Sequence, residues 1–276
     1  MNFKDQITKY NSKNQSFTTA KLLGGTLICV IPIDGKIIIV SDKRSINQNI
    51  GEIIRNDIEK TIQINPNSVI SIIGTISIDY GPGAPFPAYD VVTEVKKIFQ
   101  NKKNNLDHND STSVKLEIQQ SLQRYLSNFS SQYWPKFENK PLFQIILFEN
   151  NQFLQMTIFE VYCNTTNGII VSYKGVDIKS SYLMAIGNTA VLNNSKNIHE
   201  LNNLISNETF IKITNPNYQG FISEQEAITI AKLTIRQSAQ YWNQVQGNLN
   251  DISTNLDVIV ISCTEGITFK EKNTEN

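Results

Sequence analysis

Residues 25–45 read GTLICVIPIDGKIIIVSDKRS, and the pattern of their apolar side chains indicates the fold class. Residues 27–33 and 36–41 are apolar runs rich in β-branched side chains, and Asp34 and Gly35 between them tolerate the positive φ angles of a type I′ turn. The sequence therefore predicts a β-hairpin. Because both arms are apolar at successive positions, we expect both faces of their sheet to be covered.

The rest of the chain reads as groups of strands and groups of helices. We expect further strands at 59–64, 68–73 (followed by Gly74), 143–149, 152–159, 182–186, 257–262 and 267–269. We expect helices that begin with Pro87 in a first turn, that cover 114–129, and that follow a capping box of Ser223 and Glu226. Hairpins and grouped helices favour the α+β class over a doubly wound sheet. The predicted architecture is a four-layer αββα sandwich, with two antiparallel sheets face to face and helices outside.

The charge balance argues against two classes of partner. The chain has 276 residues, with 25 Lys and Arg side chains against 25 Asp and Glu side chains. No net field therefore draws it to nucleic acid or to an anionic membrane surface, and we expect neither partner. No segment approaches the roughly 18 consecutive apolar residues of a membrane span, and residues 1–20 lack the apolar middle of a secretory signal. We expect a cytoplasmic protein.

Cysteine and histidine are too sparse and too scattered to suggest a metal or a disulfide framework. Cys29, Cys163 and Cys263 have no paired spacing, and each is expected to be a small buried hydrophobic residue. His108 and His199 have no Cys or His close to them in the sequence. We therefore expect no metal and no cofactor.

The stretch quoted above resembles the start of a mature proteasome β subunit and of the related bacterial two-component peptidase, both N-terminal-nucleophile hydrolases. In these families a processed N-terminal threonine opens a strand, a glycine turn follows, and the next strand ends in an aspartate before basic residues. Thr26, Gly35 and Asp42 stand at these positions. Lys60 matches the family's lysine if the preceding loop is two residues longer here. Gly74, in SVISIIGTIS, matches the glycine whose amide binds the oxyanion.

The resemblance extends over most of residues 26–269, and it implies further site residues. In YLMAIGNTAV, Asn188 stands where the family usually has a serine that supports the nucleophile. Ile46 and Ile72 map near the family's substrate pocket, which implies a preference for an apolar residue before the scissile bond. The aspartate and serine that the family supplies after its long helix have no clean match in YWNQVQGNLNDIST.

The chemistry of the family explains the residue types. A threonine hydroxyl needs a group that takes its proton, and the free α-amino group of the same residue can do so. Lys60 would lower the pKa of that amine and stabilise a developing alkoxide, while Asp42 would hold Lys60 in place. The amide of Gly74 would donate to the tetrahedral oxyanion. The resemblance thus implies a threonine-type peptidase with Thr26 as the nucleophile.

This chemistry requires that residues 1–25 be removed. Gly25 has no side chain to obstruct attack by Thr26 on its carbonyl, so we expect autocatalytic cleavage of the Gly25-Thr26 bond. Residues 1–25 are then a propeptide, and residues 26–276 form one domain. The resemblance also implies a homo-oligomeric ring that acts on peptides or unfolded proteins, with an ATPase unfoldase as a possible partner.

Other interpretations of the same residues stay open. Taken singly, Thr26 is a strand-favouring residue, Asp42 and Lys60 can form an ordinary ion pair, and Gly74 can end a strand. At the level of function, the chain can be a catalytically inactive proteasome-like subunit that keeps its leader and serves assembly or binding. It can also be an N-terminal-nucleophile hydrolase of a small amide. Cys29 cannot be the nucleophile of such an enzyme, because it lies three residues inside the strand.

Overall fold

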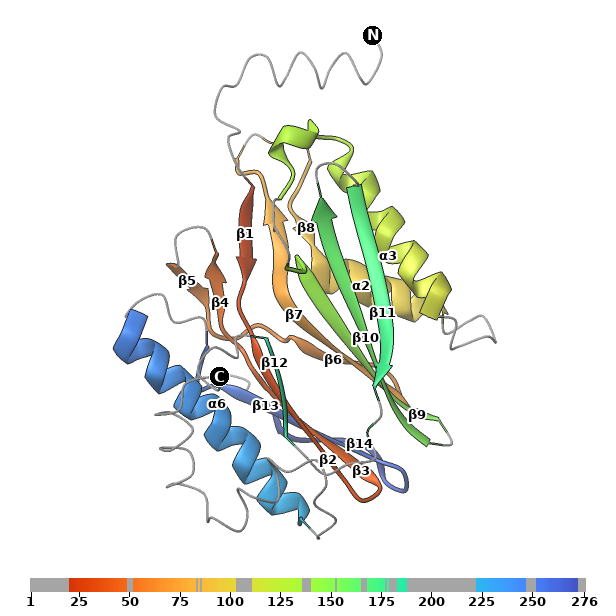
Figure 1. Ribbon diagram of the computed structural model, residues 1–276, viewed down its shortest axis with the longest axis vertical. Helices are drawn as coiled ribbons and strands as arrows, with labels where there is room; N and C mark the ends of the chain where they lie inside the picture. The colour runs from red at the N-terminus through yellow and green to blue at the C-terminus, as the bar shows by residue number, and fades with distance from the viewer. Residues whose placement is uncertain are drawn as a thin grey trace.

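Strands dominate the protein, and they form two antiparallel sheets (Figure 1). The structure, a computed structural model, describes residues 20–48, 52–82, 84, 86–102, 111–135, 140–151, 153–164, 168–176, 178, 183–187, 222–246 and 252–272. Within these ranges one sheet has five strands and the other has nine. Antiparallel sheets with helices grouped between runs of strands confirm the predicted α+β class.

The predicted hairpin lies in the five-stranded sheet. In order across this sheet, the described strands are β12 (Met184–Gly187), β2 (Leu27–Ile33), β3 (Lys36–Asp42), β13 (Leu256–Ser262) and β14 (Gly266–Lys272). Val30 of β2 pairs with Ile39 of β3, and Gly35 in the turn has a φ of 64°. The hairpin predicted near the end of the chain is also confirmed, since β13 and β14 pair with each other.

Both faces of this sheet are covered, as the two apolar arms predict. Leu27, Cys29 and Ile31 of β2 pack in a cluster with the helix α6 (Glu224–Gln246). Ile28 and Val30, which point to the opposite face, pack in a second cluster with residues of the nine-stranded sheet. The continuous apolar run in the sequence thus reflects burial on both sides.

The second sheet is built around one long strand. Its described strands follow the order β11 (Gly168–Val176), β10 (Phe153–Asn164), β9 (Phe143–Asn151), β7 (Ser68–Asp79), β1 (Lys21–Gly24), β4 (Ser45–Asn47) and β5 (Glu52–Arg55), while β6 (Thr61–Asn65) and β8 (Tyr89–Asp90) also pair with β7. The sequence predicts β6, β7, β9 and β10 but not β1, β4, β5, β8 or β11. The missed strands are short, or they take their pairing from distant parts of the chain.

Strand β7 corrects one prediction. The sequence predicts that this strand ends at Gly74, but it continues to Asp79. Gly74 has a φ of 88°, and the pairing of β7 with β1 shifts register where Leu23 pairs with Ser77 and Gly24 with Thr75. The glycine and this bulge bend the strand without ending it, because ladder pairing resumes on both sides of the irregularity.

The helices differ from the predictions mainly at their ends. The first, α2 (Val91–Lys102), begins four residues after Pro87, so the expected place of Pro87 in its first turn is wrong. The side chain of Asp90 accepts a hydrogen bond from the Thr93 amide at 2.8 Å and caps α2 instead. The second helix is α3 (Ser111–Leu126), and a short 3₁₀ helix, η1 (Ser131–Tyr133), follows it.

The capping box that precedes α6 is confirmed. The Ser223 amide donates to the Glu226 carboxylate at 2.9 Å, and the Glu226 amide donates to Ser223 Oγ at 3.2 Å. The expected inner face is also confirmed where side chains are described. It consists of Ala227, Ile230, Ala231, Ile235 and Ala239.

Three apolar clusters connect these elements. One joins α2 and α3 to β7, β9 and β10 of the nine-stranded sheet, and another joins α6 to the five-stranded sheet. The third contains residues of both sheets, including Ile39 of β3 and Phe148 of β9, both fully buried. No helix in the described ranges is long and apolar enough to cross a membrane.

Candidate functional site

The site lies where β1 ends and β2 begins. Strand β1 runs between β7 and β4 and is antiparallel to both, with Leu23 opposite Ser77 on one side and Asn47 on the other. Figure 1 shows β1 entering the sheet beside β7 and β4. Ala20 and Leu22 are buried. The last residues of the expected propeptide are therefore part of the sheet.

Strands β1 and β6 lie end to end along one edge of β7. The Gly25 amide, just after β1, donates to the Gly74 carbonyl at 3.3 Å, and the Ile72 amide donates to the Lys60 carbonyl, just before β6, at 2.8 Å. Backbone groups of residues two apart on a strand point to the same edge. Gly25 and Lys60 therefore meet beside β7, although 35 residues separate them in the sequence.

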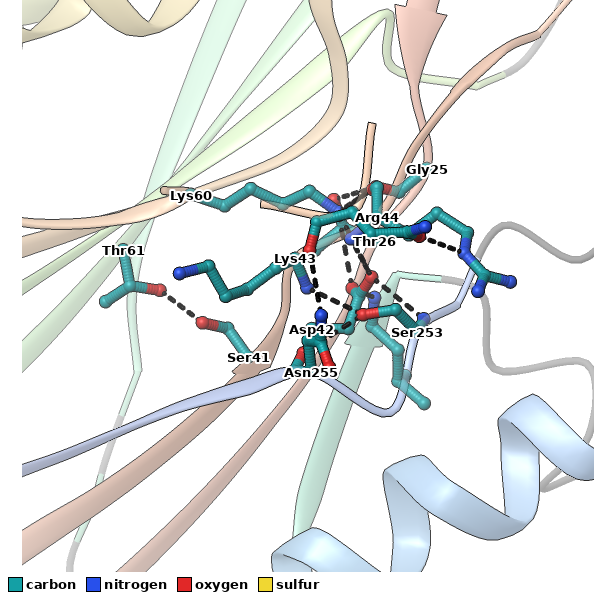
Figure 2. Close-up of polar contacts among 12 residues, drawn as sticks. Gly25, Thr26, Ser41, Asp42, Lys43, Arg44, Lys60, Thr61, Ser253 and Asn255 are labelled. Carbon is teal, nitrogen blue, oxygen red and sulfur yellow. Dashed lines mark hydrogen bonds and ion pairs between the residues drawn. The ribbon is translucent and has the colours of Figure 1, made fainter. Parts of the chain in front are cut away.

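The Lys60 ammonium contacts the carbonyl oxygen of the Gly25-Thr26 bond, the bond expected to be cleaved. Lys60 is fully buried, and its Nζ donates to the Gly25 carbonyl and to the Arg44 carbonyl. It also pairs with the Asp42 carboxylate, at 3.2 Å from Oδ2 and 3.4 Å from Oδ1 (Figure 2). A buried ammonium this close to a carbonyl oxygen polarises it and stabilises negative charge that develops there.

The Asp42 carboxylate is held by main-chain amides as well as by Lys60. It is fully buried at the end of β3, and it accepts hydrogen bonds from the amides of Leu27 at 2.8 Å, Arg44 at 2.9 Å and Ser253 at 3.4 Å. Each carboxylate oxygen thus has amide donors in addition to the ammonium. Such compensation is what a buried ion pair needs in order to be retained.

A group of hydroxyls beside the ion pair connects the two sheets. Thr61 Oγ1 of β6 donates to Ser41 Oγ of β3 at 3.0 Å and lies 2.9 Å from Ser71 Oγ of β7. Thr61 follows Lys60, and Ser41 precedes Asp42, so these bonds hold the two strand ends that carry the ion pair (Figure 2). Their side chains are almost completely buried, which places the bonds in a low-dielectric interior.

Thr26 is buried at the start of the hairpin. Its side-chain oxygen donates to the Gly25 carbonyl, and the residue is 2 % exposed. Its main chain lies against Gly187 at the end of β12, where a Cβ would come within 2.1 Å of the Thr26 carbonyl oxygen. Gly187 also has a φ of 115°, so glycine is required there both by conformation and by the close approach.

The structure brings together four of the predicted residues: Gly25, Thr26, Asp42 and Lys60 (Figure 2). For Gly74, the contact with the junction is through its carbonyl, and the role of its amide as an oxyanion donor stays a prediction.

The remaining predicted residues are placed as follows. Ile46 of β4 lies opposite Gly24, and Ile72 is fully buried in the cluster with α2 and α3. Asn188 lies outside the described residues.

Ser253 is a site residue that the sequence analysis missed. Its amide reaches Asp42, and its Oγ accepts a hydrogen bond from the Lys43 amide at 3.4 Å. It lies in YWNQVQGNLNDIST, where no family motif is recognisable. Two signals could have found it: the resemblance implies a serine after the long helix, and Ser253 lies three residues before β13, whose Leu256 pairs with Asp42 at the site.

Metal and thiol chemistry find little support in the described part of the chain. No group of three or more His, Cys, Asp or Glu side chains there could hold a metal ion. The Cys29 side chain is fully buried against α6, and burial, aided by the Asp42 charge, raises the pKa of its thiol. A buried thiol with a raised pKa is a poor nucleophile.

Comparison of the chain with protein-family models and with curated protein sequences found no match.

Proposed function

We propose that the protein is a threonine-type peptidase that cleaves its own Gly25-Thr26 bond and then uses Thr26 as a nucleophile. One observation carries this proposal: the Thr26 hydroxyl and the buried Lys60 ammonium both contact the carbonyl oxygen of Gly25. The ammonium that pairs with Asp42 and contacts the Arg44 carbonyl thus also reaches the carbonyl that precedes Thr26. The sequence resemblance points to the same bond.

The self-cleavage follows from these contacts. Thr26 Oγ1 attacks the Gly25 carbonyl carbon, and the oxygen of that carbonyl becomes an oxyanion that the Lys60 ammonium stabilises. The bond from the carbon to the Thr26 nitrogen then breaks, and the hydroxyl proton goes to that nitrogen. The product is an ester between Gly25 and Thr26. Water hydrolyses the ester, releases residues 1–25 with a free carboxylate, and restores the Thr26 hydroxyl.

The processed chain has the groups that the next reaction needs. The new α-amino group of Thr26 has an unperturbed pKa of about 7.7–8.0, so a usable fraction is neutral near pH 7 and can take the hydroxyl proton. Lys60, held by Asp42, supplies a fixed positive charge beside the alkoxide that forms. Thr26, Lys60 and Asp42 then act as nucleophile, electrostatic stabiliser and positioning residue.

The wider proposal covers architecture and assembly. The three apolar clusters, one under α2 and α3, one between the sheets and one under α6, support a four-layer αββα sandwich spanning residues 26–276. We place the protein in the cytoplasm as a homo-oligomeric ring that hydrolyses peptides or unfolded proteins, with an ATPase unfoldase as a possible partner. These parts rest on the resemblance.

The mass of the purified chain tests the proposal. We expect the wild type to lose residues 1–25 and Thr26→Ala to keep them. Thr234→Ala is a matched control, because Thr234 is also a fully buried threonine but lies in α6 and bonds to the Ile230 carbonyl. It should be cleaved like the wild type. A folded wild-type chain that keeps residues 1–25 would overturn the proposal.

One observation favours a second candidate, an inactive subunit that keeps its leader. Strand β1 pairs with β4 and with β7, and its Leu22 is buried, so the uncleaved leader fits the sheet well. If the leader is retained, its role lies in assembly or binding.

Fluorogenic peptides tested beside Thr26→Ala separate a peptidase from a hydrolase of small amides.

A further inference from the structure

The position of β1 bears on which substrates the site accepts, an inference that rests on the proposed function. Before cleavage, residues 21–24 fill the space between β4 and β7 as a strand that pairs with both neighbours. Their release leaves two strand edges facing one another across a gap one strand wide. An extended peptide can enter such a gap by adding a strand, with main-chain hydrogen bonds to both edges. The leader is thus a template for the bound substrate.

The second residue before the bond has no room for a side chain. A Cβ on Gly24 would lie 2.2 Å from Gln48 Nε2 and 2.3 Å from the Gly74 carbonyl oxygen. The second atom belongs to the backbone of β7 and cannot rotate away. Gln48 is itself held in place. Its main-chain amide donates to the Leu22 carbonyl at 2.7 Å, and its side-chain Oε1 accepts from Thr75 Oγ1 at 3.1 Å. Any residue other than glycine has to displace the strand.

The first residue before the bond is restricted by conformation. Gly25 has a φ of 101°, in the region that side chains with L chirality rarely adopt. This φ turns the chain so that the Gly25 carbonyl oxygen meets Lys60 and the Thr26 hydroxyl. A residue with a side chain pays a steric penalty to present its carbonyl in the same way.

The fourth residue before the bond occupies an apolar position. Leu22 is 5 % exposed and packs in the cluster that includes Ile78 and Tyr80. The third residue, Leu23, is only partly buried and packs against the edge of the same cluster. The leader thus presents one buried apolar side chain followed, two residues later, by two glycines.

We propose that the processed protein selects chains in which two glycines precede the scissile bond and an apolar residue stands four positions before it. The substrate class is a peptide or protein segment of the form apolar-x-Gly-Gly. This differs from the expectation, drawn from Ile46 and Ile72, that an apolar residue directly precedes the bond. Ile46 pairs with Gly24, and Ile72 faces the helices.

The test uses the wild-type chain after its own processing and the fluorogenic peptide acetyl-Lys-Leu-Leu-Gly-Gly-aminomethylcoumarin. Alanine at the second position before the bond should lower kcat/KM by about 100-fold, because displacing the strand by about 1 Å misplaces the carbonyl. Alanine at the first position should lower it by about tenfold, the cost of the unfavourable φ. Serine at the fourth position should lower it by about tenfold through lost apolar burial.

Binding gives a readout independent of turnover. The product peptide acetyl-Lys-Leu-Leu-Gly-Gly should bind the processed protein in a calorimetric titration, and acetyl-Lys-Leu-Leu-Ala-Gly should bind at least tenfold more weakly.

In the unprocessed chain, Gly24→Ala should slow release of residues 1–25. The matched control is Gly175→Ala, where a Cβ meets nothing within 4 Å and cleavage should be unchanged.

The outcomes separate this inference from the proposed function. A processed protein that cleaves the alanine and serine variants as well as the Gly-Gly peptide, and binds acetyl-Lys-Leu-Leu-Ala-Gly as tightly as acetyl-Lys-Leu-Leu-Gly-Gly, overturns the specificity and leaves the peptidase intact. A folded chain that never releases residues 1–25 overturns the peptidase and the specificity with it.

Discussion

At the scale of single residues, the site depends on two buried charges of opposite sign. Lys60 and Asp42 are both fully buried, and their atoms also meet the main chain at Gly25, Leu27 and Arg44. Isolated charges in such surroundings are strongly destabilising, whereas a compensated pair is tolerated. The pair therefore stabilises the junction only as a unit.

Asp42→Asn tests this dependence. The change leaves the Lys60 ammonium without its carboxylate, so we expect the free energy of unfolding to fall by about 3–5 kcal/mol and cleavage at Gly25 to stop. Urea unfolding and intact mass measure the two effects. The double variant Asp42→Asn/Lys60→Met removes both charges and should regain much of the stability while cleavage stays absent.

A second buried ion pair supplies the control for Asp42→Asn. Lys43 and Asp257 are 7 % and 2 % exposed and lie 3.5 Å apart. Asp257→Asn should also lower stability, but the chain should still lose residues 1–25 under conditions where it is folded. Cleavage of Asp42→Asn at the wild-type rate would contradict the role of the ion pair at the junction.

The thiols give a second test at this scale. Burial raises the pKa of the Cys29 thiol, and it raises that of Cys163 to about 11. The expectation that all three cysteines are buried is wrong for Cys263, which is exposed in the turn after β13. At pH 8 a disulfide reagent should therefore modify one thiol in the folded chain and all three after denaturation. Rapid modification of Cys29 in the native protein would show that the core under α6 is open.

At the scale of elements, the site is assembled by short strands that meet end to end or edge to edge. The register shift between β1 and β7 sets Gly24 against the Gly74 carbonyl, and β12 closes on the first residue of the hairpin. Bulges and glycines next to active sites commonly redirect groups in this way. The predicted end of a strand at Gly74 was wrong because a glycine can also mark a bend within a strand.

Gly187→Ala tests the closure of β12 on Thr26. Its Cβ would come within 2.1 Å of the Thr26 carbonyl oxygen, and its φ is unfavourable for alanine. We expect a loss of about 1–3 kcal/mol of stability and slower release of residues 1–25. Gly175→Ala, at an open position, should change stability by no more than about 0.5 kcal/mol. Unchanged cleavage in Gly187→Ala would show that β12 does not position Thr26.

At the scale of the whole molecule, the site lies where the two sheets meet. Asp42 comes from the five-stranded sheet, and Lys60 directly precedes a strand of the nine-stranded sheet. The cluster that contains residues of both sheets therefore determines whether Asp42 and Lys60 stay within ion-pair distance. We expect damage to this cluster to affect both sheets and the site together.

Phe148→Ala tests whether damage to the cluster shared by the sheets affects both sheets together. Phe148 is fully buried in the cluster shared by the sheets, so its truncation should cost about 3–5 kcal/mol. Urea unfolding should remain a single transition, at lower denaturant. Phe153→Ala, at a side chain that is 72 % exposed, should stay within about 0.5 kcal/mol of the wild type. Two separate transitions would show that the sheets unfold independently.

The central hairpin, the α+β class, the capping box of α6 and the residues of the ion pair were all predictable from the amino-acid sequence. These features leave local signals, namely apolar periodicity, a turn dipeptide, a cap and a spaced motif. Three further features emerge from the folded chain alone: residues 21–24 form a strand between β4 and β7, β7 bends at Gly74, and Ser253 joins the site. These features arise from pairing between segments distant along the chain, and a short segment carries no local pattern for a partner that only folding brings to it.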